Sequence, residues 1–430
     1  MLGTSTLPAT TSSAVPPNVA RCSASEQPAV SPIDVPTGIA PTTSAIPVPL
    51  LDVSRGNNPL RDEIVQALAD VYDSGRFLHG PQVTQLEEHV ARLSNTKHAV
   101  GCASGSDALL LALMALGIGP GDEVIVPSFT FFATASCVQR VGAKIVFADI
   151  DPQTYNIDPV EIQAKVTSRT RAIIPVHLFG QAAAMDAICN IADGRDIPVI
   201  EDCAQAIGGA YHGRPLGSWG QMSCTSFYPT KNLGGLGDGG MLTLNSDILA
   251  DRLRLLAGHG MRPRYHHSVV GINSRLDTLQ AAALLVKMRH LLQYTTARQD
   301  NAQRYVELFQ QAGLADSRGN GAVGLPYRDP AAFHVWNQFS LRIGDGQRDH
   351  LRSYLQQCNI GSEIYYPIPL HQQVCFRDCG YATGSLPHTE QAAAEILHLP
   401  IYPELTRAEQ EQVVATIAAY YREAYHRKAS

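Results

Sequence analysis

The sequence predicts an α/β fold, in which a large domain with a mostly parallel seven-stranded sheet covered by helices precedes a smaller α+β domain. Two observations carry this prediction. Short apolar runs rich in β-branched residues alternate with helical stretches, and this alternation is typical of parallel strands joined by helices. The chain of 430 residues also exceeds the roughly 250 to 300 residues that one hydrophobic core serves, so we expect two domains.

The predicted elements follow one another in regular order. A helical run at residues 275–313 is too long for one compact lobe and is suited to bridging two. After it come a strand in FHVWNQFSLRI, an amphipathic helix in RDHLRSYLQQCNIG and a closing helix in TRAEQEQVVATIAAYYREAY. The strands of the large domain are expected at 99–102, 123–126, 144–148, 172–177, 199–201, 224–228 and 241–244, with helices at 107–116, 131–141, 159–165 and 185–192. We therefore divide the chain into a disordered Pro-, Ser- and Thr-rich tail at 1–46, a large domain at 47–295 and a small domain at 296–430.

Composition excludes several classes of protein. With a net charge of -6 and 17% charged residues, the chain has no electrostatic reason to bind nucleic acid or an anionic membrane. It shows no secretory signal pattern and no apolar run near the roughly 20 residues of a membrane span. The nine cysteines are odd in number and scattered, which favours reduced thiols in the cytoplasm.

No set of residues completes a metal site in the sequence. Cys375 and Cys379 lack a second ligand pair at suitable spacing. His259, His266 and His267 lack a carboxylate or cysteine to complete a ligand set, and we interpret them as part of a mobile loop near the mouth of an active site. The sequence therefore predicts no bound metal.

Ligands of open parallel sheets bind beyond the carboxyl ends of the strands, so we expect the functional residues at the strand ends. In GCASGSDALLLALMALG a strand runs into a helix through Ser104, Gly105 and Ser106, and the amides of a helix start form a site for a phosphate. The alternative is capping alone, with Ser106 as the N-cap. In IPVIEDCAQAIGG an apolar strand ends in Glu201 and Asp202, and a buried carboxylate there needs a cation or a donor. Two other roles for this acid remain open, as the N-cap of a helix or as a ligand of magnesium.

Lys231 lies in SFYPTKNLGGLGDGG, between an aromatic β-type run and a glycine loop. The glycines match G-x-G-x-x-G, but a strand follows them instead of a helix, so the dinucleotide-binding context is missing. Only six of the 33 Lys and Arg residues are lysines, so Lys231 is not surface filler. An amine nucleophile cannot be replaced by arginine, which does not deprotonate in proteins. A phosphate site, an acid and an amine are together what pyridoxal 5'-phosphate (PLP) requires.

These stretches resemble the DegT/DnrJ/EryC1/StrS family of sugar aminotransferases, PLP enzymes of fold type I. The matching segments include SGRFLHGPQVTQLEEHVA, GPGDEVIVPSFTFFATASCV, SFYPTKNLGGLGDGGML, GINSRLDTLQAAAL and IYYPIPLHQQ, and the resemblance extends from about Val48 to Tyr420. It implies these roles: Lys231 as the Schiff-base lysine; Asp202 at the pyridinium nitrogen; Gln205 at the ring hydroxyl; Gly105, Ser106 and Ser226 at the phosphate; Phe131 stacked on the ring; Asn273 reaching the partner subunit's cofactor phosphate; Arg275 as a substrate or interface contact; and Tyr365, Tyr366 and His371 near the sugar.

The resemblance also implies an activity. A homodimer with shared active sites would move an amino group from L-glutamate to a keto group of a nucleotide-linked sugar, in a ping-pong cycle. The motifs look closer to enzymes of 3-keto than of 4-keto sugars, although Tyr365 stands where some 3-keto-acid enzymes carry histidine. Two alternatives are a PLP-dependent sugar dehydratase, in which histidine replaces the lysine, and a non-catalytic regulatory relative. Phe131 could also be ordinary core, Arg275 a structural ion pair, and the tyrosines interface packing.

Overall fold

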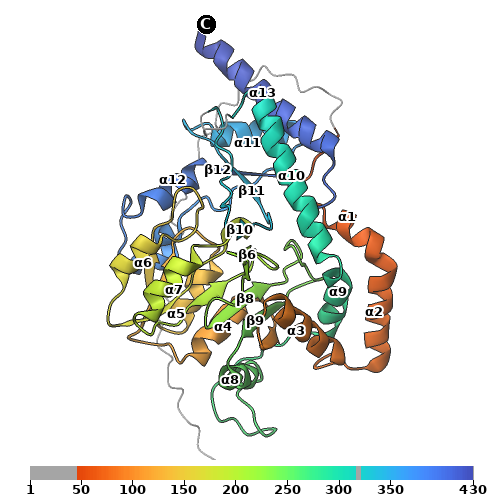
Figure 1. Ribbon diagram of the computed structural model, residues 1–430, viewed down its shortest axis with the longest axis vertical. Coiled ribbons are helices and arrows are strands. Elements are labelled where there is room, and N and C mark those ends of the chain that lie inside the picture. Colours follow the sequence, from red (N-terminus) through yellow and green to blue (C-terminus); the bar gives the residue numbers. More distant parts are fainter. Residues whose placement is uncertain (1–45, 316–320, 430) are drawn as a thin grey trace, which may run out of the picture. The chain divides into compact units, whose positions relative to one another are not determined.

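The computed structural model describes residues 46–315 and 321–429, and Figure 1 shows their helices and strands. The predicted disordered tail, all but its last residue, lies outside the described residues. By their contacts, the described residues form one compact unit. A division of that unit into a large and a small domain at about residue 296 stays a prediction.

Seven strands form the central sheet, in the order β3-β2-β4-β5-β8-β9-β1. Parallel bridges from Ile173 to Val199 and from Val176 to Asp202 join its two halves. Only β9 runs antiparallel to its neighbours, β8 and β1. The strands are β1 (His98–Cys102), β2 (Glu123–Pro127), β3 (Lys144–Ala148), β4 (Thr170–Ile173), β5 (Ile200–Asp202), β8 (Met222–Ser226) and β9 (Gly240–Leu244). The predicted mostly parallel seven-stranded sheet is confirmed.

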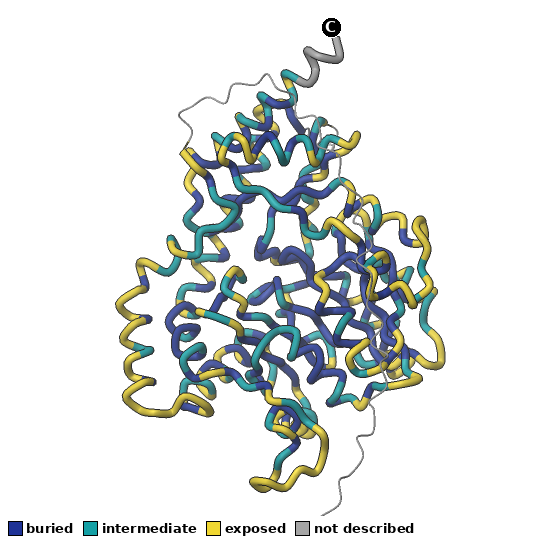
Figure 2. Tube along the Cα trace, turned by 180° about the vertical axis from the view of Figure 1, so that it is seen from behind, coloured by how far each residue is buried: buried dark blue, intermediate teal, exposed yellow. Residues whose placement is uncertain are grey.

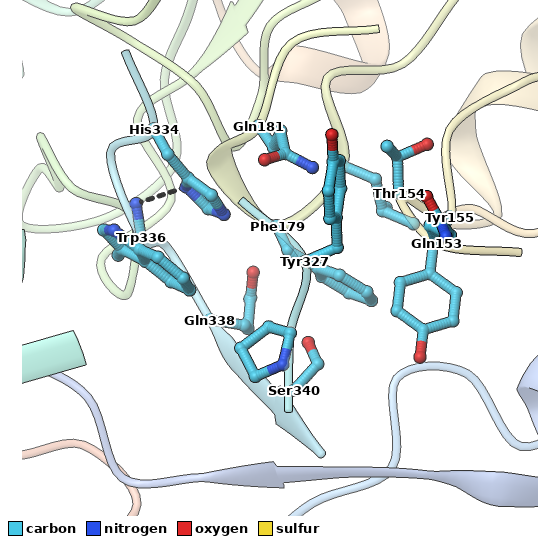
Figure 3. A pocket seen from close by; sticks show the side chains of 12 residues that line it. Gln153, Thr154, Tyr155, Phe179, Gln181, Tyr327, His334, Trp336, Gln338 and Ser340 are labelled. Atoms are coloured by element: carbon cyan, nitrogen blue, oxygen red, sulfur yellow. Dashed lines mark hydrogen bonds between the residues drawn. The ribbon is translucent and has the colours of Figure 1, made fainter. Parts of the chain in front are cut away.

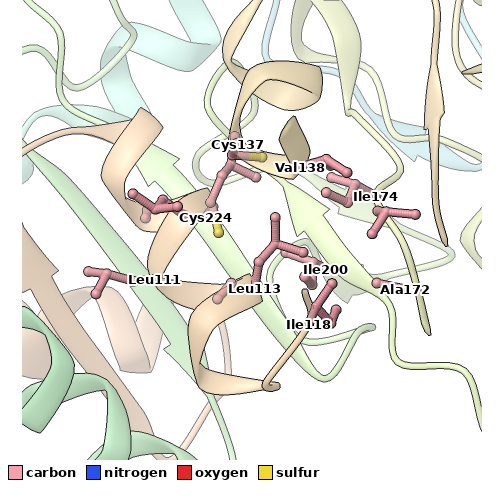
Figure 4. Close-up of a cluster of buried hydrophobic side chains, with 14 of the residues drawn as sticks. Leu111, Leu113, Ile118, Cys137, Val138, Ala172, Ile174, Ile200 and Cys224 are labelled. Carbon is pink, nitrogen blue, oxygen red and sulfur yellow. The ribbon is translucent and has the colours of Figure 1, made fainter. Parts of the chain in front are cut away.

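Helices bury both faces of this sheet, because alternate residues of a strand point to opposite sides. In β1, Val100 and Cys102 join one apolar cluster with α4, α5 and α8, whereas Ala99 joins another with α3 and α9. Figure 4 shows the first cluster, and Figure 2 shows buried residues gathered in the interior of the trace. The helices of this part are α1 (Val53–Asn57), α2 (Arg61–Ser74), α3 (Pro81–Leu93), α4 (Gly105–Ala115), α5 (Ala133–Arg140), α6 (Pro159–Lys165), α7 (Met185–Asp193), α8 (Asp247–Ala257) and α9 (Thr278–Met288).

The C-terminal part is built around a small antiparallel pair, β11 (Phe339–Arg342) and β12 (Ile396–Leu399). Another small sheet combines β6 (Ala210–Tyr211), β7 (Arg214–Pro215) and β10 (Ala332–Phe333). The helices here are α10 (Leu291–Gln311), α11 (Arg348–Gln357), α12 (Pro387–Glu395) and α13 (Arg407–Ala429). Short 3-10 turns occupy Asn58–Leu60, Leu178–Gly180, Leu370–Gln372 and Val374–Cys379.

One predicted element is wrong in its extent. The helical run at 275–313 is two helices, α9 and α10, which are separated at Arg289 and His290. The backbone N–H of His290 donates to Lys287 instead of continuing the α-helical pattern, although neither Gly nor Pro marks the break. α9 packs on α2 and α3, whereas α10 packs on α13.

The described part of the chain shows neither a membrane-spanning helix nor a disulfide bond. None of its helices combines the length and the apolar composition that crossing a bilayer requires. Eight cysteines there are free thiols, of which only Cys375 is exposed.

Candidate active site

The start of α4 lies directly beyond the carboxyl end of β1. Its N-cap is Ser104, whose Oγ accepts the backbone N–H of Asp107 at 3.1 Å. The alternative that gave this role to Ser106 is wrong, because the helix begins at Gly105, two residues before the predicted start. Gly105 and Ser106 thus occupy the first turn, where backbone N–H groups lack partners within the helix and can bind an anion.

Two glycines let β8 and β9 approach this helix start. A Cβ on Gly240 would lie 2.3 Å from the carbonyl carbon and oxygen of Ser104. A Cβ on Gly105 would lie 2.7 Å from Cβ of Ser226. The structure therefore brings the helix start at Gly105 and Ser106 beside Ser226, which lies more than a hundred residues further along the sequence.

Asp202 ends β5 at the same edge and is only 4% exposed. Its Oδ1 accepts the N–H of Ala204 at 3.2 Å, and its Oδ2 accepts the hydroxyl of Thr134 at 2.9 Å. Burial raises the pKa of Asp202, and the Thr134 hydroxyl, the Ala204 amide, Lys231 and His177 oppose that rise. A cation stabilises a carboxylate in this position, and the protonated nitrogen of a pyridine ring would be such a cation.

Sequence reasoning missed Thr134. The side chain is fully buried near the start of α5, and its hydroxyl lies 3.2 Å from that of Thr130. The signal was weak, since the aromatic residues of SFTFFAT are its most distinctive feature and a threonine beside them is not. The position of Thr134 just beyond the end of β2 would have marked it by the strand-end rule.

Glu201, the other acid of the strand end, belongs to the interior below the site. Its two oxygens accept the N–H groups of Gly217, Trp219 and Gly220, and Oε2 lies 3.1 Å from Nε2 of His177. Nδ1 of His177 accepts the N–H of Ala183, which leaves Nε2 to donate to Glu201. Glu201, His177 and Cys203 lie close enough to hold a metal, but these bonds already occupy both the carboxylate and the imidazole.

Lys231 stands in the loop between β8 and β9. The loop is fastened at both ends, because Phe227 N donates to Gly239 O and Gly235 N donates to Phe227 O. Burial lowers the pKa of the Lys231 amine to about 8, against the opposing pull of Asp202. The amine makes no hydrogen bond or ion pair with any residue that the structure describes. It therefore has the properties of a nucleophile, with a substantial uncharged fraction near neutral pH.

An amide and two aromatic side chains lie near Asp202. Gln205 accepts the N–H of Phe179 at 2.7 Å and donates to the Tyr366 hydroxyl at 3.3 Å. The Phe131 ring is 56% exposed and lies 6.2 Å from the ring of Tyr366. Phe131 is therefore not ordinary core, and its face is accessible for stacking.

Asn273 and Arg275 line a groove of about 510 Å³ next to the helix start. Ala103, Ser104, Asp238, Asp277 and Gln280 also line it. Arg275 makes no ion pair or hydrogen bond within the described part of the chain, so its reading as a structural ion pair finds no support there. Both polar side chains are available to a ligand or a second subunit.

The remaining predicted substrate residues differ in their surroundings. Tyr365 is half-buried, and its ring packs 5.0 Å from that of His398. His371 is 2% exposed, with Nδ1 at 2.7 Å from Ser128 Oγ and Nε2 at 3.2 Å from Glu390. The ring of His371 thus links the 3-10 turn Leu370–Gln372 to Ser128, just after β2, and to Glu390 of α12, so both ring nitrogens already have partners within the protein.

The three histidines after α8 are exposed on the loop that leads to Asn273. Nδ1 of His267 lies 3.0 Å from the carbonyl oxygen of His259. Their interpretation as part of a mobile loop stays a prediction.

A separate pocket behind Phe179 is too small for a sugar. It holds about 10 Å³, close to the space of one water molecule. Figure 3 shows its lining of aromatic and amide side chains, among them Tyr155, Gln181, His334 and Gln338. This pocket therefore has no room for the substrate.

The residues at the sheet edge fit PLP. A helix start with close glycine contacts can hold a phosphate, the buried carboxylate of Asp202 can pair with a ring nitrogen, and the Lys231 amine can bond to an aldehyde. The lowered pKa of Lys231 suits an amine that bonds to an aldehyde. A cation beside Asp202 would oppose the burial that raises the pKa of this carboxyl group. The structure thus assembles pieces that are distant in sequence.

Comparisons with known proteins agree with this arrangement. The model of the DegT/DnrJ/EryC1/StrS aminotransferase family matches residues 58–418. A "Pleiotropic regulatory protein" of Geobacillus stearothermophilus is 48% identical over 87% of this chain and 99% of its own length. A "UDP-N-acetyl-3-dehydro-alpha-D-glucosamine 3-aminotransferase" of Acidithiobacillus ferrooxidans is 44% identical, over 88% of this chain and 98% of its own.

Solved structures share the fold. DesV of S. venezuelae, in complex with a ketimine intermediate, has a TM-score of 0.83 and 40% identity, covering 87% of this chain and 99% of its own. NtdA of Bacillus subtilis, with bound cofactor PMP, has a TM-score of 0.79 and 31% identity, covering 89% and 86%. The predicted fold type is confirmed, and structural relatives hold the cofactor that the site fits.

Proposed function

Because this chain belongs to the DegT/DnrJ/EryC1/StrS family of PLP-dependent sugar aminotransferases, we propose that it transfers an amino group from L-glutamate to a nucleotide-linked keto-sugar. The product would serve cell-surface polysaccharide or other glycoconjugate synthesis. The observation that carries the proposal is the Lys231 amine, with its pKa lowered to about 8, in the same buried site as Asp202.

Each residue of the site has a task in this reaction. PLP supplies an aldehyde and an electron-accepting ring when it is bound. Lys231 holds the cofactor between turnovers and, when released, moves a proton. Asp202 keeps the ring nitrogen protonated, and Gln205 contacts the ring hydroxyl. Gly105, Ser106 and Ser226 hold the phosphate, and Phe131 stacks on the ring.

We favour a 3-keto over a 4-keto sugar. The support is the Acidithiobacillus relative, whose name states a 3-amino transfer, and the motifs GINSRLDTLQAA and IYYPIPLHQQ. Tyr365 and Tyr366 are proposed to line the sugar site, with His371 behind them and Arg275 at the groove. A panel of 3-keto and 4-keto UDP-, dTDP- and GDP-sugars, assayed with L-glutamate, tests this order of preference. Faster turnover of the 4-keto series would overturn it, and Lys231→Ala should abolish turnover of every sugar.

We further propose a homodimer in which Asn273 of one subunit reaches the phosphate of its partner's cofactor. Two observations support a shared site: Asn273 and Arg275 both line the groove, and Arg275 has no ion-pair partner among the described residues. Lys231→Ala and Asn273→Ala homodimers should each be impaired. Refolding the two variants together should create one intact site in each mixed dimer and restore activity. Activity no greater than the sum of the two parents would argue against shared sites.

A regulatory role is the competing hypothesis, because a relative at 48% identity is named a regulatory protein. Retention of both Lys231 and Asp202 favours the enzyme. L-Glutamate added to the PLP-bound protein should shift the cofactor absorbance to that of the amine form. An unchanged spectrum, with the cofactor demonstrably bound, would support a silent binder.

A further inference from the structure

Two buried cations, Lys287 of α9 and Arg298 of α10, have no ion-pair partner in the described part of the chain. Lys287 is 8% exposed and Arg298 is 4% exposed. Nζ of Lys287 donates to the carbonyl of Gly234, and Nη1 of Arg298 donates to those of Trp336 and Ile401. Nε of Arg298 has no hydrogen-bond partner. Burial of a charge without a counter-charge is costly, so this pair calls for an anion.

Both cations line one cavity of about 50 Å³, and Lys231 lines it too. Tyr294, Glu404 and five residues of the segment 51–57 also line it, and it is partly open to solvent. The volume is several times the roughly 10 to 15 Å³ that a single water needs, and it can hold a carboxylate group or a halide.

The charges around the cavity leave a positive excess. Burial lowers the pKa of Lys287, and that of Arg298 to about 10, while Glu404 opposes both shifts without forming an ion pair with either. Asp52, also on the wall, is engaged by Ser54 and Arg55. Apart from Lys231, which the proposed function bonds to the cofactor, two cations therefore face one available carboxylate, and one monovalent anion would balance them.

We propose that this cavity is a binding site for a small monovalent anion, and that a carboxylate of the amino donor is its ligand during turnover. The first part stands on the cations alone. The second part rests on the proposed aminotransferase function. It also rests on Lys231 lining the cavity, because an amino donor that displaces the Lys231 amine from the cofactor would lie next to the cavity.

Bromide tests the anion site directly. Crystals of the PLP-bound enzyme soaked in bromide should show an anomalous peak in the cavity, and acetate should displace it. Lys287→Met and Arg298→Met should lose the peak. Arg289→Met, which removes an exposed cation two residues from Lys287, should keep it. A wild-type cavity without bromide would overturn the proposal.

Glu404→Gln gives a test with the opposite sign and does not depend on the folding of the cation variants. It removes the one free negative charge of the wall, so bromide and acetate should bind more tightly than in the wild type. Equal or weaker binding would contradict the charge balance on which the site rests.

The donor assignment is tested by kinetics. Lys287→Met should raise the KM for L-glutamate about tenfold, the effect of one lost charge-assisted hydrogen bond. The KM for the keto-sugar should change little, and acetate should compete with glutamate. Bromide binding without these effects would identify a free-anion site and overturn the donor assignment. The crystallographic arm remains decisive even if no sugar is turned over.

Discussion

At the scale of single residues, the lowered pKa of Lys231 predicts how capture of the cofactor by the proposed amine depends on pH. The amine of a free lysine titrates near 10.5, whereas burial brings that of Lys231 to about 8. Below pH 8 the uncharged fraction falls about tenfold per pH unit. The rate at which apoenzyme captures PLP should therefore rise with pH up to about 8 and then level off. Stopped-flow absorbance measures this rate. A rate that keeps rising toward pH 10.5 would show that the amine has the ordinary pKa of a lysine in water.

Thr134 is the positioning residue for Asp202 that we expect to matter most. Thr134→Val removes the hydroxyl donor at 2.9 Å and lets burial raise the pKa of Asp202 further. A hydrogen bond to a charged group is worth about 1.5 to 3 kcal/mol, so kcat should fall at least about tenfold.

Thr134→Ser should restore the donor and most of the activity. The pH dependence of the cofactor spectrum gives a second readout, because loss of packing alone would not move it. Thr130→Val, which removes only the neighbour of Thr134, is the matched control. If Ser and Val behave alike at position 134, the hydroxyl has no positioning role.

The sequence predicted the residues with an unusual context and missed those with an ordinary one. Lysine is scarce in this chain, and Asp202 ends an apolar strand, so the sequence pattern pointed to both residues. A threonine near a helix start has no such mark. Lys287 and Arg298 approach the Lys231 loop only through the packing of α9 and α10, which no local pattern encodes.

At the scale of elements, the close contact between β9 and the start of α4 predicts a sensitive glycine. Gly240→Ala would place a methyl group 2.3 Å from the Ser104 carbonyl, and backbone cannot move aside cheaply. We expect a loss of about 1 to 3 kcal/mol in the free energy of unfolding, with weaker PLP binding.

Gly344→Ala is the matched control, because its added Cβ would meet nothing within 4 Å. Urea denaturation and PLP titration check both variants. Equal behaviour of the two would show that β9 and α4 are less tightly coupled than the structure indicates.

Elements with a strong periodic pattern were predicted well, because β-branched runs have few alternatives in a buried sheet. The predicted strand in FHVWNQFSLRI is instead split into β10 and β11. Between them, the N–H groups of Val335 and Asn337 donate to Gly180 and Phe179. Partners more than 150 residues away in sequence thus occupy the backbone groups that a continuous strand would need.

At the scale of the whole molecule, buried histidines should make the fold sensitive to acid. Burial lowers the pKa of His334 and of His398 from 6.5 to about 3. Between these values the unfolded chain binds protons that the folded chain does not, so stability is lost as the pH falls. Each histidine should cost about 1.4 kcal/mol per pH unit below 6.5.

Urea denaturation at several pH values in the upper half of that window measures the slope. His398→Gln should reduce the slope by the contribution of one proton, and adding His334→Gln should reduce it by another. A slope that neither substitution changes would assign the acid sensitivity to other groups.

The antiparallel direction of β9 has a kinetic consequence. Because β9 returns beside β8, the loop that carries Lys231 leaves and re-enters the sheet at one edge, pinned at Ser226 and Gly240. The amine is thereby a tethered reagent with a high effective molarity toward whatever occupies that edge. During turnover it should recapture the cofactor by an intramolecular step that outpaces escape into solvent, so that one loaded molecule completes many cycles without reloading.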